Sequence, residues 1–116
     1  MPSLFEPCGL PQMTSAIYGS LPIVRNTGGL HDSVSPMDLE AGTGNGFLFD
    51  TYDSGGLAWA IDQAMEFHSL DEHTRGTHVG RVMAESKERF NHAVTAQAYI
   101  DIYQQMLQRP LVDEVF

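Results

Sequence analysis

The sequence predicts an α/β fold in which short parallel strands alternate with helices. Two compact apolar runs, at 21–24 and 46–49, have the length and the bounding glycines of buried strands. Segments with apolar residues at helical spacing lie before, between and after these runs. Because two strands are fewer than the ~5 to 6 of a typical sheet, we expect the sheet to be incomplete.

The first half of the chain is predicted to hold one short helix beside the two strands. This helix spans residues 10–18, where Pro11 suits the first turn and Gly19 suits the position just beyond the end. The segment 26–29, Asn-Thr-Gly-Gly, follows the first strand and is predicted to be a glycine turn. The polar, glycine-rich segment 35–45 is predicted to be a flexible connection.

Three more helices are predicted in the second half. One begins after the N-cap residue Asp53, the next begins at about Asp71, and the last begins near His92 and is ended by Pro110. Neither an internal repeat nor a low-complexity stretch interrupts the chain. Residues 1–116 are therefore predicted to form a single partial domain.

The charge and the cysteine content of the chain limit its expected binding partners and its expected cellular compartment. The 116 residues are 42% hydrophobic, and 15 Asp and Glu against six Lys and Arg give a formal charge of -9. Such a charge repels phosphate backbones and anionic lipid surfaces, so neither nucleic acid nor a membrane is an expected partner. The single cysteine, Cys8, cannot form an internal disulfide, and no apolar run approaches the ~20 residues that span a bilayer. We expect a soluble chain in the cytoplasm.

The segment 6–10, Glu-Pro-Cys-Gly-Leu, is the strongest candidate for chemistry. It places a carboxylate before a glycine turn that opens a helix. Free amides and the positive end of the helix dipole attract phosphate oxygens, and a carboxylate accepts hydrogen bonds from sugar hydroxyls. On local physics alone, a solvated turn is the commoner interpretation of such a segment.

Three ordered motifs resemble the nucleotide-sugar half-site of the starch and glycogen synthases: Phe-Glu-Pro-Cys-Gly-Leu at 5–10, Tyr-Gly-Ser-Leu-Pro-Ile-Val-Arg at 18–25 and Thr-Gly-Gly-Leu at 27–30. The likeness continues to residue 103 and so spans nearly the whole chain. It implies a GT-B glycosyltransferase, in which two Rossmann-like domains face each other across a cleft. These enzymes transfer glucose from ADP-glucose or UDP-glucose to an α-1,4-glucan with retention, in glycogen or starch biosynthesis. Another GT-B transferase is the nearest alternative among enzymes.

This chain resembles the C-terminal half of the second GT-B domain, which is a partial Rossmann-like domain. By this resemblance Glu6 is the catalytic residue and contacts the donor glucose, while backbone amides of the following turn hold its hydroxyls and diphosphate. The resemblance assigns donor binding to Glu6, Cys8, Gly9, Leu10, Pro11, Thr14, Gly28 and Gly29. Pro11 lacks an amide hydrogen, and Thr14 stands where the wider GT-B group often has a second Glu. No cofactor and no metal are implied.

We expect the chain to be an inactive fragment of such an enzyme. The phosphate-binding Arg and Lys of the family and its acceptor-binding domain precede these motifs, and Lys87 is the only lysine here. In the parent enzyme, the partners would be the nucleotide-sugar donor and an α-glucan. The alternative is a non-catalytic binding module that self-associates through an exposed sheet edge or the C-terminal helix. The sequence does not choose between ADP-glucose and UDP-glucose.

Several other residues are interpreted as structural. The glycine-rich segment 42–46 lacks the spacing of a dinucleotide-binding fingerprint. The five-residue spacing of His68, His73 and His78 rotates successive side chains by ~140° on a helix, which favours surface histidines over a shared metal site. Cys8 is expected to line the site rather than act as a nucleophile. Five aromatic residues are expected to fill the core rather than form a sugar-stacking platform: Trp59, Phe67, Phe90, Tyr99 and Tyr103.

Overall fold

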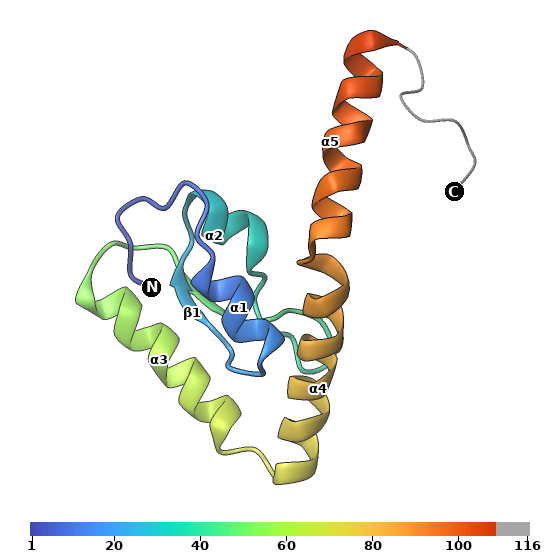
Figure 1. The fold of residues 1–116 in the computed structure, drawn as a ribbon. Coiled ribbons are helices and arrows are strands. Elements are labelled where there is room, and N and C mark those ends of the chain that lie inside the picture. The colour runs from blue at the N-terminus through green and yellow to red at the C-terminus, as the bar shows by residue number, and fades with distance from the viewer. Residues whose placement is uncertain (109–116) are drawn as a thin grey trace. The chain divides into compact units, whose positions relative to one another are not determined.

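The computed structural model describes residues 1–108. Within them the chain forms two compact units, of which the first spans Met1–Ser86 and the second begins at Lys87. Two strands and five helices follow one another along the described chain (Figure 1). Their order is α1 (Pro11–Ile17), β1 (Ile23–Arg25), α2 (Gly28–Ser33), β2 (Phe47–Phe49), α3 (Ser54–His68), α4 (Glu72–Arg89) and α5 (His92–Leu107).

The two strands lie parallel, as predicted, with Val24 opposite Leu48 in the centre of the register. Met1 continues the hydrogen bonding on the other side of β1. Its ammonium group donates to the carbonyl of Ile23 at 2.7 Å, and the amide of Arg25 donates to the carbonyl of Met1 at 3.0 Å. These two bonds form one step of a parallel ladder, so β1 is bonded along both edges.

The core of the first unit lies where β1 and α2 meet. Val24 and Leu30 are fully buried and Val34 is 2% exposed, and together they form one apolar cluster. Helix α3 packs against both strands, and it contributes the buried side chains Ala60 and Phe67. This packing confirms the α/β class with short parallel strands.

The predicted starts of the three later helices are confirmed by their caps. The Asp53 carboxylate accepts from the amide of Gly56 at 2.7 Å at the start of α3. The Asp71 carboxylate accepts from the amide of Thr74 at the start of α4. The side chain of Asn91 accepts from the amide of Val94 at the start of α5. Such caps satisfy amides that have no partner within the helix. The predicted stop at Pro110 lies outside the described residues.

The segment predicted as a glycine turn differs from expectation, because Gly28–Ser33 forms the short helix α2. Thr27 precedes it in an extended conformation, and the Thr27 carbonyl accepts from the amides of Leu30 and His31. Two glycines disfavour a helix intrinsically. The burial of Leu30 in the core offsets this cost. A local sequence pattern does not reveal that burial.

The connection between α2 and β2, predicted to be flexible, is hydrogen-bonded at its base and near its tip. The side chain of Asn45 accepts from the amide of Ser35 at 2.7 Å and donates to the carbonyl of Ser33 at 3.0 Å. The guanidinium of Arg81 donates to the carbonyl of Gly44 at 3.0 Å. The glycine-rich segment is therefore tied to both α2 and α4.

The prediction that the five aromatic residues fill the core is wrong for three of them. Phe67 is 7% exposed, whereas Trp59, Tyr99 and Tyr103 are 56%, 58% and 50% exposed. Phe90 has intermediate exposure. Helical periodicity identified the helices that carry these rings, but it does not show whether another element covers the ring. No helix among residues 1–108 is long and apolar enough to cross a membrane.

Candidate functional site

The turn at 6–10 meets the start of α2, which brings together two motifs that are about twenty residues apart in sequence. The amide of Gly29 donates to the carbonyl of Glu6 at 2.8 Å. A Cβ at Gly28 would lie 2.0 Å from that carbonyl oxygen, and a Cβ at Gly29 would lie 2.1 Å from the carbonyl oxygen of Cys8. Gly28 also has a φ of +49°. Only glycine allows two backbones to approach this closely.

Gln12 supports the same turn from beneath, and sequence analysis missed it. Its side chain is 2% exposed, and its Nε2 donates to the carbonyls of Cys8 and Gly9 at 3.1 and 2.9 Å and to Ser33 Oγ at 3.0 Å. Ser33 Oγ in turn donates to the carbonyl of Gly29 at 2.6 Å. Gln12 therefore links the turn to α2. Glutamine is usually exposed, so its place in the sequence carried no signal of this role.

The polar groups of the turn are available to a ligand. The amides of Cys8, Gly9 and Leu10 donate to no backbone carbonyl within residues 1–108, and no side chain caps α1. Cys8 is exposed and Glu6 is partly exposed, and the Glu6 carboxylate has no hydrogen-bond or ion-pair partner in the same range. Together these groups can accept hydrogen bonds from hydroxyls and donate hydrogen bonds to anionic oxygens.

The remaining assigned residues lie at the edge of this arrangement. Leu10 is the N-cap of α1, and Pro11 is its first residue, so α1 begins with one amide fewer. Thr14 is exposed and lies one turn further along α1, where its amide donates to the carbonyl of Leu10 at 3.1 Å. The turn, Gly28 and Gly29 are therefore brought together, and Thr14 stands apart from them along the helix.

Arg25 is a second residue whose role was not foreseen. Its guanidinium donates to the carbonyl of Leu4 at 2.5 Å and lies over the ring of Tyr52, with 5.4 Å to the ring centroid. Arg25 is the first basic side chain in the sequence. Its hydrogen bond to Leu4 fixes the segment that precedes Glu6.

Comparison with known proteins identifies the relatives of this chain. No protein-family model matches it. The glycogen synthase of Desulforudis audaxviator is 42% identical over 109 residues, which are 94% of this chain and 21% of that protein. The glycogen synthase of Bacillus cereus is 39% identical over 108 residues, which are 93% of this chain and 22% of that protein.

A solved structure shows the same relationship in three dimensions. It is the catalytic domain of starch synthase IV from Arabidopsis thaliana bound to ADP and acarbose, with a TM-score of 0.77 and 37% identity. The match covers 93% of this chain and 22% of that one. The chain thus spans about a fifth of the length of the relatives that it matches. Sequence and fold together show that this chain is homologous to a segment of the glycogen and starch synthases.

Proposed function

We propose that this chain carries part of the donor site of a retaining glucosyltransferase and is inactive by itself. The whole enzyme would transfer glucose from ADP-glucose or UDP-glucose to an α-1,4-glucan. One observation carries the proposal: the turn at 6–10 is held rigidly by Gln12 and by the two glycines of α2, while its outward polar groups remain without partners. Rigid support of polar groups is typical of a binding site.

Glu6 would accept hydrogen bonds from hydroxyls of the donor glucose. The amides of Cys8, Gly9 and Leu10 would donate to the sugar and the diphosphate, with Pro11 and Thr14 beside them. The similar starch synthase structure is bound to ADP and acarbose, which supports a nucleotide sugar and a glucan as the two ligands. The single cysteine of the chain supports a cytoplasmic setting.

Inactivity of the isolated chain follows from charge. A departing nucleoside diphosphate needs cations close to its oxygens. In the first unit, Arg25 donates to backbone carbonyls, Arg75 donates to the carbonyls of His68 and Leu70, and Arg81 pairs with Glu85 and the carbonyl of Gly44. The first unit, residues 1–86, thus offers the turn no Lys or Arg side chain without a partner.

Calorimetric titration and a glucan-elongation assay test the proposal. The full-length protein that contains this segment should bind ADP-glucose or UDP-glucose. The nucleotide sugar that it binds more tightly is its expected donor. The purified 116 residues should transfer no measurable glucose to an α-glucan. Elongation by the purified chain would overturn its predicted inactivity.

Gln12 provides a sharper test of the turn itself. In the full-length protein, Gln12→Ala should raise the KM for the donor about tenfold or more, because the amides at 8–10 lose their support. Gln97→Ala is the matched control, since Gln97 is an exposed residue of α5 that donates to Asp101 of the same helix. Equal donor KM values for the two variants would show that the turn at 6–10 is not part of the donor site.

A self-association module is the second candidate function. The observation that favours it is α5, which has no buried residue and exposes six large apolar side chains. The coding sequence upstream of Met1 discriminates the two functions. A continuous frame that encodes an Arg–Lys pair and a glycine-rich loop favours the enzyme fragment, and a true start at Met1 favours the module.

A further inference from the structure

The place of the Glu6 carboxylate is set by the backbone that carries it, because the carboxylate has no partner within residues 1–108. On one side, the carbonyl of Glu6 accepts from the amide of Gly29 at 2.8 Å. On the other side, Nη1 of Arg25 donates to the carbonyls of Ser3 and Leu4 at 3.4 and 2.5 Å. The segment that ends at Glu6 is therefore held at both ends, and a side chain holds its beginning.

Arg25 lies where an α/β fold is expected to bind a ligand. It is the last residue of β1 and is paired with Phe49, the last residue of β2. Ligands of open parallel sheets bind beyond the carboxyl ends of the strands. The side chain of Arg25 has intermediate exposure and its Nε is buried. Its guanidinium is thus partly enclosed at the end of the sheet, and it bonds the segment that leads to Glu6.

Tyr52 covers this guanidinium. Cζ of Arg25 lies 5.4 Å from the centroid of the Tyr52 ring, which is within the range of a cation–π contact. Tyr52 belongs to the loop 50–53 between β2 and α3. Asn26 attaches the same loop to the end of β1, because its Nδ2 donates to Oδ1 of Asp50 at 2.8 Å. The ring therefore reaches Arg25 from a loop that is itself bonded to the residue after β1.

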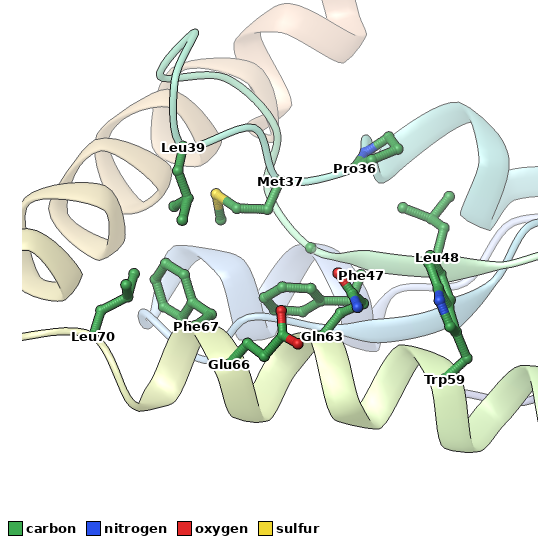
Figure 2. Close-up of a pocket in the computed structure, with 11 residues that line it drawn as sticks. Pro36, Met37, Leu39, Phe47, Leu48, Trp59, Gln63, Glu66, Phe67 and Leu70 are labelled. Atoms are coloured by element: carbon green, nitrogen blue, oxygen red, sulfur yellow. The ribbon is translucent and has the colours of Figure 1, made fainter.

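Strand β2, which leads into this loop, is anchored to α3 by an aromatic pair. The ring centroids of Phe47 and Phe67 are 5.9 Å apart. Figure 2 shows both side chains at a cavity of about 270 Å³ that residues of β2 and α3 line. Trp59 lines this cavity and an adjoining one of about 820 Å³, whereas neither Arg25 nor Tyr52 lines either of them. The contact between Arg25 and Tyr52 is therefore separate from both cavities.

We propose that Arg25 positions the Glu6 carboxylate in the donor site. It does so through the carbonyls of Ser3 and Leu4, with Tyr52 covering its guanidinium. This inference rests on the proposed function, because that function assigns Glu6 to the donor glucose. Arg25 is then a positioning residue that does not touch the donor. Lysine cannot replace it, because an ammonium is a point charge on a flexible chain, whereas a guanidinium holds its N–H groups in a fixed plane.

Arg75 provides a matched control within the same unit. Its Nη1 donates to the carbonyls of His68 and Leu70 at 2.6 and 3.4 Å, so it makes the same kind of contact as Arg25. Its side chain also has intermediate exposure. None of the printed contacts of Arg75 reaches the turn at 6–10. A general cost of losing such an arginine should therefore appear equally at both positions.

Steady-state kinetics of the full-length protein distinguish the two arginines. Arg25→Lys should lower kcat about tenfold or more and change the donor KM by less than about threefold, because a displaced Glu6 loses contacts in the transition state. Arg75→Lys should leave both constants within about twofold of the parent. Equal kinetics of the two variants would overturn the proposal. A raised donor KM with unchanged kcat in Arg25→Lys would overturn it as well, since it would indicate direct binding of the donor.

Tyr52 is tested by removing its hydroxyl and its ring in separate variants. Tyr52→Phe keeps the ring over Arg25 and should retain the kcat of the parent. Tyr52→Ala should lower kcat about threefold and leave the donor KM unchanged. An unchanged kcat in Tyr52→Ala would contradict the role given to the ring. Circular dichroism establishes that each variant is folded.

A double substitution shows whether Arg25 acts through Glu6. In a Glu6→Gln background, Arg25→Lys should lower the residual rate by no more than about twofold, because there is no carboxylate left to position. Transfer of radiolabelled glucose measures these slow rates. If Arg25→Lys lowers the rate as much in Glu6→Gln as in the parent, the positioning role is wrong and the proposed function stands. If Glu6→Gln is as active as the parent, the proposed function is wrong, and this inference is wrong with it.

Discussion

Gly28 and Gly29 illustrate how a single methyl group can decide whether the proposed site forms. Each glycine lies against a carbonyl oxygen of the turn at 6–10, at about 2 Å from where a Cβ would be. A backbone oxygen has no rotamer by which to move aside, so the two segments would have to separate. The same residues were predicted as part of the donor site, and the structure supplies a packing reason for their identity.

Gly28→Ala and Gly29→Ala should each lower the free energy of unfolding by about 2 to 4 kcal/mol, because each adds a clash with backbone and Gly28 also has a positive φ. Gly76→Ala and Gly80→Ala are matched controls on α4, where an added Cβ meets nothing within 4 Å. They should raise the free energy of unfolding by about 0.5 to 1 kcal/mol through helix propensity. Urea denaturation measures all four, and equal effects at the two pairs would refute the packing argument.

Glu6 is the residue on which the proposed chemistry depends. In the full-length enzyme, Glu6→Ala should lower turnover by orders of magnitude and leave the unfolding midpoint nearly unchanged, because the carboxylate makes no contact that stabilises the described fold. Glu88→Ala is the control for loss of an exposed Glu. Initial rates of glucan elongation provide the measurement. Activity of Glu6→Ala within about threefold of the parent would remove Glu6 from the site.

At the level of elements, the helices begin where side-chain caps allow them to begin. Asp53, Asp71 and Asn91 each accept a hydrogen bond from the amide three residues later. Two of these caps are carboxylates and one is a neutral amide. The carboxylate cap Asp71 and the amide cap Asn91 therefore predict different responses to pH for α4 and α5.

Asp71→Ala should lower the midpoint of denaturation at neutral pH. Hydrogen bonds from the backbone amide of Thr74, and then from its side chain, hold the pKa of the Asp71 carboxyl below its ordinary value. A lowered pKa in the folded state means that the stabilisation is present above the ordinary carboxyl pKa and is lost as the pH falls through the lowered one. The difference between Asp71→Ala and the parent should therefore shrink in acid.

Asn91→Ala serves as the control for this pH dependence, because an amide cap does not titrate. Its effect on the denaturation midpoint should persist in acid to a greater degree than that of Asp71→Ala. Denaturation followed by circular dichroism at neutral and acidic pH measures both variants. An Asp71→Ala effect of constant size across the pH range would show that the charge of the cap contributes nothing.

Helix α2 shows the limit of element-level patterns. Its sequence, Gly-Gly-Leu-His-Asp-Ser, contains no helical repeat and only one strong helix former, Leu30. It is helical because Leu30 is buried in the core and because Gly29 bonds to the carbonyl of Glu6. Tertiary contacts here override local propensity, and in doing so they complete the support of the turn.

On the scale of the whole molecule, the described chain leaves much apolar surface uncovered. Six large apolar side chains of α5 are between 47% and 74% exposed: Val94, Tyr99, Ile102, Tyr103, Met106 and Leu107. Surface of this kind is typical of a contact with another polypeptide. It fits a segment that spans about a fifth of its relatives.

The isolated chain is predicted to self-associate through α5. Apolar burial contributes ~25 cal/mol per Å², whereas repulsion between charges is largely screened beyond ~8 Å at physiological salt. A two-fold dimer buries the same face twice. Sedimentation at increasing protein concentration should show the dimer.

Tyr103→Glu should shift the chain towards monomer, and Gln105→Glu is the control because it adds the same charge at an exposed polar position of α5. Equal sedimentation of the two variants would exclude α5 as the contact. A purely monomeric parent chain at high concentration, with a cooperative melt, would overturn the prediction altogether.

The sequence by itself determined the features that depend on neighbours along the chain. Apolar periodicity predicted α1, α3, α4 and α5, cap residues predicted where helices begin, and compact apolar runs predicted two parallel strands. The motifs at 5–10, 18–25 and 27–30 indicated the family. These signals are local because backbone propensity and capping act within a few residues.

Only the tertiary structure decided which side chains are covered and which segments meet. It buried Gln12 beneath the turn, brought Gly28 and Gly29 against Glu6 and Cys8, and left Trp59 exposed beside a cavity. Each of these features depends on a contact between residues far apart in sequence, for example the 21 residues that separate Gln12 from Ser33. Periodicity tells which face of a helix is apolar, but coverage of that face depends on what other segments fold against it.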